Sequence, residues 1–209
     1  MVRVKVCGIN EPGALATAIE AGVDWLGLVF FPPSPRFVTP GRAAELADLA
    51  AGGPPLVGLF VDPTEEQIAA TLAQVRLDVL QVYGAEPGIR RLKLRFGLPV
   101  WQAVGVETEA DLPAEASEAD RLVLEARPPV AATRPGGNAR RFDWSLLARW
   151  QAPAPWLLAG GLNPANVAEA VRVTGAVAVD VSSGVERRPG VKDPSLIREF
   201  VAEARSGGF

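Results

Sequence analysis

Short apolar runs alternate with amphipathic stretches along the whole chain. Eight runs have the composition of buried strands: Val2–Cys7, Trp25–Phe30, Leu56–Val61, Val79–Val82, Val100–Val104, Arg121–Glu125, Trp156–Ala159 and Ala176–Val181. Each precedes an amphipathic stretch that is typical of a helix: Pro12–Ala21, Gly41–Ala51, Thr64–Gln74, Pro87–Phe96, Glu107–Ala114, Asp143–Trp150, Pro164–Val173 and Asp193–Ala204. Near-continuous apolar strands are typical of a parallel sheet that helices cover. The pattern predicts eight βα units, arranged as a closed barrel or as a doubly wound open sheet.

Two glycine- and serine-rich turns follow the last two predicted strands. Gly160 and Gly161 follow the seventh strand, and Ser182, Ser183 and Gly184 follow the eighth. Bare backbone N–H groups near a helix start attract anions, and paired phosphate loops after strands 7 and 8 recur in (β/α)₈ barrels. Neither turn is specific alone, because glycine after a strand is common. Together, these five residues favour a (β/α)₈ TIM barrel that binds a phosphorylated small molecule.

The first strand has one polar and one apolar face. Arg3, Lys5 and Cys7 share the face that should point into a barrel, whereas the valines between them should pack on helices. Lys5 then needs an anionic partner, because an unpaired buried charge is costly, and Asp180 is a candidate. A positive charge one layer below Cys7 would also favour its thiolate. The alternative for Cys7 is a small buried hydrophobic residue.

Several polar side chains stand where predicted strands end, which is where barrel enzymes carry their chemistry. Glu125 ends the sixth strand, and a carboxylate is rarely core filler. Arg36 lies in a proline-rich loop and suits a ligand carboxylate. Gln81, Tyr83 and Asp180 could hydrogen-bond a ligand. The structural alternatives are a salt bridge from Glu125 to an arginine of the next loop, a surface position for Arg36, and a role as the partner of Lys5 for Asp180.

Composition limits the chemistry. The 209 residues include no histidine and one cysteine, so imidazole catalysis, histidine metal sites and an internal disulfide are excluded. Proton transfer must therefore use carboxylates, cysteine, lysine or tyrosine. A net charge of −3 with scattered basic residues makes nucleic acid an unexpected partner.

Length and hydropathy indicate one domain over residues 1–209, because apolar residues make up 48% of the chain. No apolar run approaches the roughly 18 residues that span a bilayer, and the N-terminus does not resemble a signal peptide. We therefore expect no membrane contact and a cytoplasmic location. One long loop, Arg127–Arg141, is rich in proline and glycine, and we expect it to be mobile without ligand. Abundant arginine fits a thermophilic source or a GC-rich genome, and in the first case a homodimer is expected.

Blocks in the same order as those of a known family run along most of the chain. They are Lys5–Ile9, Gly27–Phe30, Ser34–Val38, Val57–Val61, Leu80–Gly84, Phe142–Trp144, Leu158–Leu162 and Val179–Glu186. Through them the chain resembles the phosphoribosylanthranilate isomerases of tryptophan biosynthesis. The resemblance implies a (β/α)₈ barrel and a cofactor-free Amadori rearrangement without a metal. It also implies that Cys7 is the general base, that Arg36 binds the anthranilate carboxylate and that the two turns bind phosphate.

Two positions differ from the family pattern. The family has an aspartate acid at the end of strand six, where this chain has Glu125. Its extra methylene moves the carboxyl group by over an ångström, and misplacement on that scale can cost about 10²-fold in rate. Tyr83 stands where the family commonly has histidine. We expect Glu125 to be the acid and Tyr83 to keep a hydrogen-bonding role.

Two other functions are compatible with a phosphate-binding barrel. One is a related enzyme such as indole-glycerol-phosphate synthase, which would use a catalytic lysine, and Lys5 is the lysine that falls on a predicted strand. The other is a binding protein that keeps the phosphate turns but has lost catalysis, which the aspartate-to-glutamate change would permit.

Overall fold

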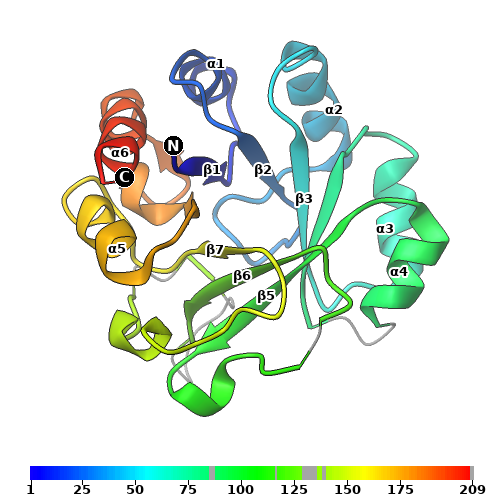
Figure 1. Cartoon of the computed structure of the whole chain (residues 1–209). Coiled ribbons are helices and arrows are strands. Elements are labelled where there is room, and N and C mark those ends of the chain that lie inside the picture. The colour runs from blue at the N-terminus through cyan, green and yellow to red at the C-terminus, as the bar shows by residue number, and fades with distance from the viewer. Residues whose placement is uncertain (85–87, 116, 129–135, 138–139, 208–209) are drawn as a thin grey trace.

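The computed structural model describes residues 1–84, 88–115, 117–128, 136–137 and 140–207. Eight parallel strands close into a barrel in chain order, and β1 pairs with β8 (Figure 1). The strands are β1 Arg3–Cys7, β2 Trp25–Val29, β3 Leu56–Val61, β4 Val79–Tyr83, β5 Val100–Val106, β6 Arg121–Ala126, β7 Trp156–Leu158 and β8 Ala178–Val181. The closed (β/α)₈ barrel is therefore confirmed, and the doubly wound sheet is not formed.

Within the described residues, six α-helices surround the barrel. They are α1 Pro12–Glu20, α2 Pro40–Leu49, α3 Glu65–Leu72, α4 Ile89–Phe96, α5 Val167–Thr174 and α6 Pro194–Ser206. Figure 1 shows α6 beside α1, so the last helix closes the outer ring against the first. In the described part of the chain, no helix is long and apolar enough to cross a membrane.

Two predicted helices are each reduced to a single 3₁₀ turn. The stretch Glu107–Ala114 contains η1 Glu109–Asp111, and Asp143–Trp150 contains η2 Trp144–Leu147. In η1 the Asp111 carboxylate accepts the N–H groups of Glu107 and Thr108, and Leu112 is extended because a proline follows it. In η2 one turn is enough to bury Trp144 and Leu147.

A small antiparallel hairpin, which the sequence pattern did not predict, follows the last barrel strand. After β8 come η3 Ser183–Val185, β9 Glu186–Arg188 and β10 Val191–Lys192. Gly190 has a φ of +80° between the two short strands, a backbone conformation that glycine adopts without strain. The hairpin lies between β8 and α6 in the chain, and so it adds an element next to the serine turn that is predicted to bind phosphate.

Side chains alternate across the barrel wall as predicted. Val4 and Val6 of β1 belong to the core between strands and helices, whereas Lys5 and Cys7 point inward and are buried. Apolar side chains from several strands fill the lower interior, where Trp25 and Trp101 pack edge to face with 5.2 Å between ring centroids. This packed layer leaves room for a cavity only toward the C-terminal ends of the strands.

Candidate active site

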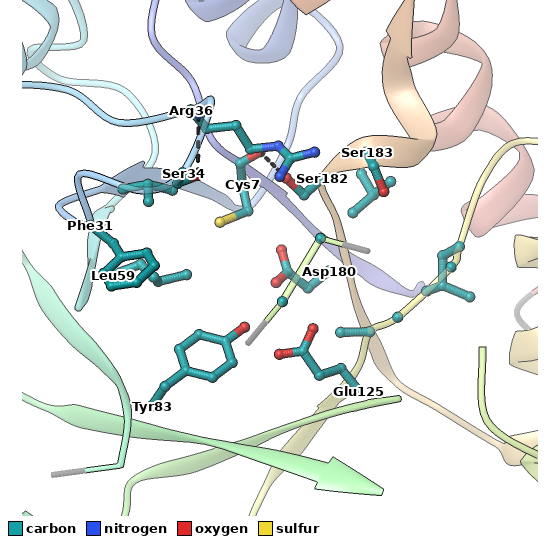
Figure 2. A pocket seen from close by; sticks show the side chains of 18 of the residues that line it. Cys7, Phe31, Ser34, Arg36, Leu59, Tyr83, Glu125, Asp180, Ser182 and Ser183 are labelled. Carbon is teal, nitrogen blue, oxygen red and sulfur yellow. Dashed lines mark hydrogen bonds between the residues drawn. The ribbon is translucent and has the colours of Figure 1, made fainter. Parts of the chain in front are cut away.

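A cavity opens at the C-terminal ends of the strands, with about 620 Å³ of empty space including its mouth. Most of the predicted site residues line it: Cys7, Arg36, Tyr83, Glu125, Gly160, Gly161, Asp180, Ser182 and Ser183. In Figure 2 the side-chain oxygens of Tyr83, Glu125 and Asp180 lie near one another, and Cys7 lies between this group and Arg36. The barrel therefore brings together chemistry from its first, fourth, sixth and eighth strands.

Two predicted site residues do not line the cavity. Gln81 precedes Tyr83 by two positions on β4 and lies one layer deeper, fully buried, and its amide atoms make no hydrogen bond within the described residues. Gly184 belongs to η3, where an added Cβ would lie 1.8 Å from the Leu162 carbonyl oxygen. Gln81 is thus too deep to line the cavity, and Gly184 permits close packing of two turns.

Lys5 and Asp180 form a buried ion pair. Their strands are in register, and Lys5 Nζ lies 3.0 Å from Asp180 Oδ1, which confirms the predicted pairing. Burial lowers the pKa of the Lys5 ammonium, but Asp180 and Cys7 together outweigh burial and raise this pKa above its ordinary value. Lys5 therefore stays cationic directly below Cys7.

The environment of Cys7 differs from the expectation of a favoured thiolate. Burial raises the pKa of the Cys7 thiol above its ordinary value. The charges of Lys5 and Lys192 lower it, and that of Asp180 raises it, but burial is the largest effect. The charge of Lys5 favours the Cys7 thiolate as predicted, but the cost of burying this thiolate is larger.

Glu125 is the second-to-last residue of β6 and is 5% exposed. Burial raises its pKa to about 8; the charge of Asp180 acts in the same direction, while Tyr83, the Gly137 N–H group and Lys5 lower it. The predicted alternative was a salt bridge to an arginine of the next loop, but Arg127 of this loop pairs instead with Asp111 and Glu107. Arg134 of the same loop lies outside the described residues. The carboxyl group is therefore mostly protonated at neutral pH and can donate a proton.

Tyr83 accompanies Glu125 at the cavity. Figure 2 shows its hydroxyl group directed toward the Glu125 carboxyl group. A Cβ on Gly136 would lie 2.5 Å from the Tyr83 hydroxyl and 2.8 Å from Glu125 Oε2, so both groups meet at this glycine. Burial, followed by Glu125, holds the pKa of Tyr83 well above its ordinary value. Tyr83 therefore stays protonated.

Arg36 is a buried arginine with an acidic partner that the sequence reasoning missed. It is 3% exposed, and its Nε and Nη2 atoms donate to the two carboxylate oxygens of Glu186 at 2.7 and 2.9 Å. Lys192 also donates to Glu186, at 2.9 Å. Burial raises the pKa of Glu186, but Arg36 and Lys192 outweigh it, so the net shift is downward. The presence of Glu186 in the last matching block was the available signal.

The glycine turn after β7 requires glycine. Gly160 and Gly161 have φ values of +81° and +66°. An added Cβ would lie 2.7 Å from the Ala126 nitrogen at Gly160 and 2.7 Å from the Arg140 carbonyl carbon at Gly161. In the adjacent turn, Ser182 Oγ donates to the Cys7 carbonyl at 3.1 Å, which connects the predicted phosphate site to the end of β1.

The opposite side of the cavity is apolar. Val29, Phe31, Leu59 and Val61 line it beside Cys7, and Figure 2 shows Phe31 next to Leu59. Most of the predicted mobile loop, at positions 129–135 and 138–139, lies outside the described residues. Within the described residues, no cluster of three or more Cys, Asp or Glu side chains could hold a metal ion. The cavity thus combines an apolar side with charged and glycine-lined sides.

These features define a (β/α)₈-barrel enzyme with its site at the C-terminal ends of the strands. A family model described as N-(5'-phosphoribosyl)anthranilate (PRA) isomerase matches residues 4–203. The chain is 54% identical over 211 residues to the N-(5'-phosphoribosyl)anthranilate isomerase of Paramagnetospirillum magneticum, covering 99% of this chain and 98% of that one. The chain belongs to the N-(5'-phosphoribosyl)anthranilate isomerase family.

Solved structures agree with this assignment. One is a phosphoribosyl anthranilate isomerase in complex with reduced 1-(o-carboxyphenylamino)-1-deoxyribulose 5-phosphate, with a TM-score of 0.82, 33% identity, and coverage of 99% of this chain and 100% of that one. Another consists of monomers generated from the dimeric Thermotoga maritima isomerase, with a TM-score of 0.80, 33% identity and the same coverage. The fold of this family is thus shared over nearly the full chain.

Proposed function

We propose that this chain converts N-(5'-phosphoribosyl)anthranilate to 1-(o-carboxyphenylamino)-1-deoxyribulose 5-phosphate in tryptophan biosynthesis. The observation that carries the proposal is that Cys7 and Glu125 line one cavity, where burial raises the pKa of the Glu125 carboxyl group to about 8. Membership of the isomerase family supports the reaction, and the solved complex of a relative with a reduced product supports the ligand. The cavity offers an apolar side for an aromatic ring, Arg36 for a carboxylate and two turns for a phosphate.

The mechanism follows from the two titratable groups. Glu125 donates its proton to the furanose ring oxygen, the C1–O bond breaks, and the ring opens to a protonated Schiff base. The Cys7 thiolate then removes the C2 proton, and the C–H electron pair forms the C1=C2 bond of an enolamine. Tautomerisation of the C2 enol to the ketone, with protonation at C1, completes the rearrangement. The oxidation at C2 is matched by the reduction at C1, so this scheme needs no cofactor.

Charge around the site supports these roles. Lys5 stays cationic through Asp180 and lowers the energy of a Cys7 thiolate, although burial dominates. Glu125 keeps its proton because burial disfavours the carboxylate. A carboxylic acid with a raised pKa next to a base of different pKa is a recurrent arrangement in acid–base catalysis. The site thus provides opposite proton roles from two residues.

The alternative that uses a catalytic lysine, as in indole-glycerol-phosphate synthase, has less support. Lys5 is fully buried against Asp180, and Lys192 is fully buried against Glu186. Lys93 pairs with Asp120 at the end of α4. None of these lysines is among the described residues that line the cavity. A binding protein without catalysis stays an alternative that the experiment below separates.

The direct test follows the loss of anthranilate-type fluorescence when N-(5'-phosphoribosyl)anthranilate, generated in situ, meets the purified chain. We expect rapid loss with the natural chain and a decrease in turnover of about 10²- to 10⁴-fold for Cys7→Ala and for Glu125→Gln. The product analogue should still bind both variants. The matched control is Glu45→Gln, because Glu45 lies on the surface in a pair with Arg42. Binding without turnover in the natural chain would favour the binding protein, and full turnover by Cys7→Ala would refute the assigned base.

Assembly and location stay predictions for this chain. The Thermotoga maritima relative is described as dimeric, which supports a homodimer. A biosynthetic role supports the cytoplasmic location. Sedimentation equilibrium of the purified chain tests the homodimer, and a monomer at micromolar concentration would contradict it.

A further inference from the structure

Glu186 is a buried acid that the proposed mechanism does not use. Its side chain is 3% exposed at the start of β9. It accepts hydrogen bonds from Arg36 Nε and Nη2, from Lys192 Nζ, and from the Gly190 N–H group at 3.2 Å. Both carboxylate oxygens are thus occupied by two donors each, which is a complete set of partners for a buried carboxylate.

The pairing fixes how Arg36 faces the cavity. One edge of the guanidinium, formed by Nε and Nη2, is used by Glu186. Nη1 is not used by Glu186 and lies beside Gly137, where an added Cβ would be 2.5 Å away. The stem is held as well, because a Cβ on Gly8 would lie 2.6 Å from Arg36 Cδ. The edge that remains, formed by Nη1 and the second hydrogen of Nη2, can hold a carboxylate in bidentate fashion.

The same carboxylate connects Arg36 to the other end of the site. Lys192 Nζ donates to Glu186 and also to the Ser182 carbonyl, both at 2.9 Å. Ser182 in turn donates to the Cys7 carbonyl. Glu186 therefore joins the arginine, the serine turn and the strand that carries the base through hydrogen bonds between buried groups.

The charges of this cluster suit an anionic ligand. Arg36 and Lys192 are cations and Glu186 is the acid between them, and all three side chains are at least 96% buried. Burial lowers the pKa of Lys192, and Glu186 opposes this shift. A buried group with one more cation than anion gains from a ligand carboxylate, because uncompensated buried charge is costly.

We propose that Glu186 is a positioning residue for substrate recognition: it holds Arg36 so that the free edge of the guanidinium receives the substrate carboxylate. The inference rests on the proposed function, because it assumes a ligand with an aromatic carboxylate. Glu186 itself does not touch the reacting atoms. Its loss should therefore change the preference for ligands that carry the carboxylate.

The experiment measures that preference by calorimetry with two ligands. They are reduced 1-(o-carboxyphenylamino)-1-deoxyribulose 5-phosphate and its counterpart with a plain phenylamino group. For the natural chain we expect the carboxylate to strengthen binding about 10- to 100-fold, as for a hydrogen bond to a charged group. For Glu186→Gln we expect this preference for the carboxylate ligand to be at least about tenfold smaller than in the natural chain. The matched control is again Glu45→Gln, which should keep it.

A second variant separates position from charge. Glu186→Gln raises the charge of the cluster by one, which by itself would strengthen binding of an anion. Glu186→Gln/Lys192→Met restores the original net charge but still lacks the fixed partner of Arg36, and it avoids two unpaired buried cations if the single variant does not fold. Loss of the carboxylate preference in both variants supports the inference.

The remaining outcomes overturn it in distinguishable ways. A preference retained or increased in Glu186→Gln, or restored in the double variant, means that Glu186 does not position Arg36, while the proposed function stands. A natural chain that binds both ligands equally overturns the assignment of Arg36 to the carboxylate together with this inference. A natural chain that binds neither ligand contradicts the proposed function itself.

Discussion

The ammonium group of Lys5 lies 3.0 Å from the Asp180 carboxylate inside the barrel, one layer below Cys7. The two residues are 175 positions apart and meet because β8 closes the barrel against β1. The pair supplies a fixed positive charge beneath the proposed base. It also makes the folded chain depend on both partners being present.

Removing one partner of this pair should destabilise the chain strongly. We expect Lys5→Met to lower the free energy of unfolding by about 3–5 kcal/mol, because it leaves Asp180 charged and unpaired in the interior. Lys5→Met/Asp180→Leu should recover most of this loss. The half-exposed pair of Lys93 and Asp120 provides the control, and Lys93→Met should cost about 1 kcal/mol or less. Urea unfolding measures all three, and equal losses for the two single variants would contradict the prediction.

The activity maximum should lie on the alkaline side. In the proposed mechanism, turnover needs Cys7 as a thiolate, and the pKa of this thiol lies above its ordinary value. It also needs Glu125 as an acid, and the pKa of this carboxyl group is about 8. The active form has Cys7 deprotonated and Glu125 protonated. Because Cys7 has the higher pKa, the population of this form rises with pH up to the pKa of Glu125 and declines above the pKa of Cys7. The profile of kcat/KM should therefore rise up to about pH 8 and fall only beyond the pKa of Cys7. Because the two groups interact, the two apparent pKa values of this profile belong to the pair and not to either residue alone. A falling limb at pH 8 with an optimum below it would show that the thiol has the lower pKa.

Tyr83 should set the position of the acidic limb. Its hydroxyl group lowers the pKa of Glu125, so Tyr83→Phe should raise that pKa further and move the acidic limb of kcat/KM to higher pH. The phenylalanine keeps the ring in place, so unfolding should change little. Stopped-flow fluorescence between pH 6 and pH 10 (roughly the range of these groups) measures the limb. An unchanged limb with reduced kcat would assign Tyr83 to substrate contact instead.

The turn at Gly161 should tolerate no side chain. Gly161 and Gly97 share a φ of +66°, but an added Cβ meets the Arg140 backbone at Gly161 and nothing within 4 Å at Gly97. Both alanine variants should lose about 1–2 kcal/mol from the left-handed backbone. Gly161→Ala should lose more and should also weaken binding of inorganic phosphate, measured as competitive inhibition. Equal stability of the two variants and equal inhibition by phosphate would contradict the assignment of this turn to the phosphate site.

Local pattern was enough for the strands and for several site residues. The alternation of Lys5 and Cys7 with valines predicted which side chains face the barrel interior, and the structure agrees. Strand ends predicted the positions of Glu125 and Arg36 at one cavity. The same rule placed Gln81 with Tyr83, although a shift of two residues along a strand is a full layer in depth. Periodicity predicts which face of a strand carries a side chain, but the depth of that side chain in the barrel depends on how the strands are staggered.

The sequence by itself indicated eight βα units, a barrel and the family, because strand periodicity, the two turns after the last strands and the order of the matching blocks are all read along the chain. The tertiary structure decided the state and the partners of the site residues. Glu125 keeps its proton because several strands bury it, and Arg36 uses one edge for Glu186, 150 positions away. Burial and charge pairing depend on every element packed around a group, and these contacts exist only after the barrel closes.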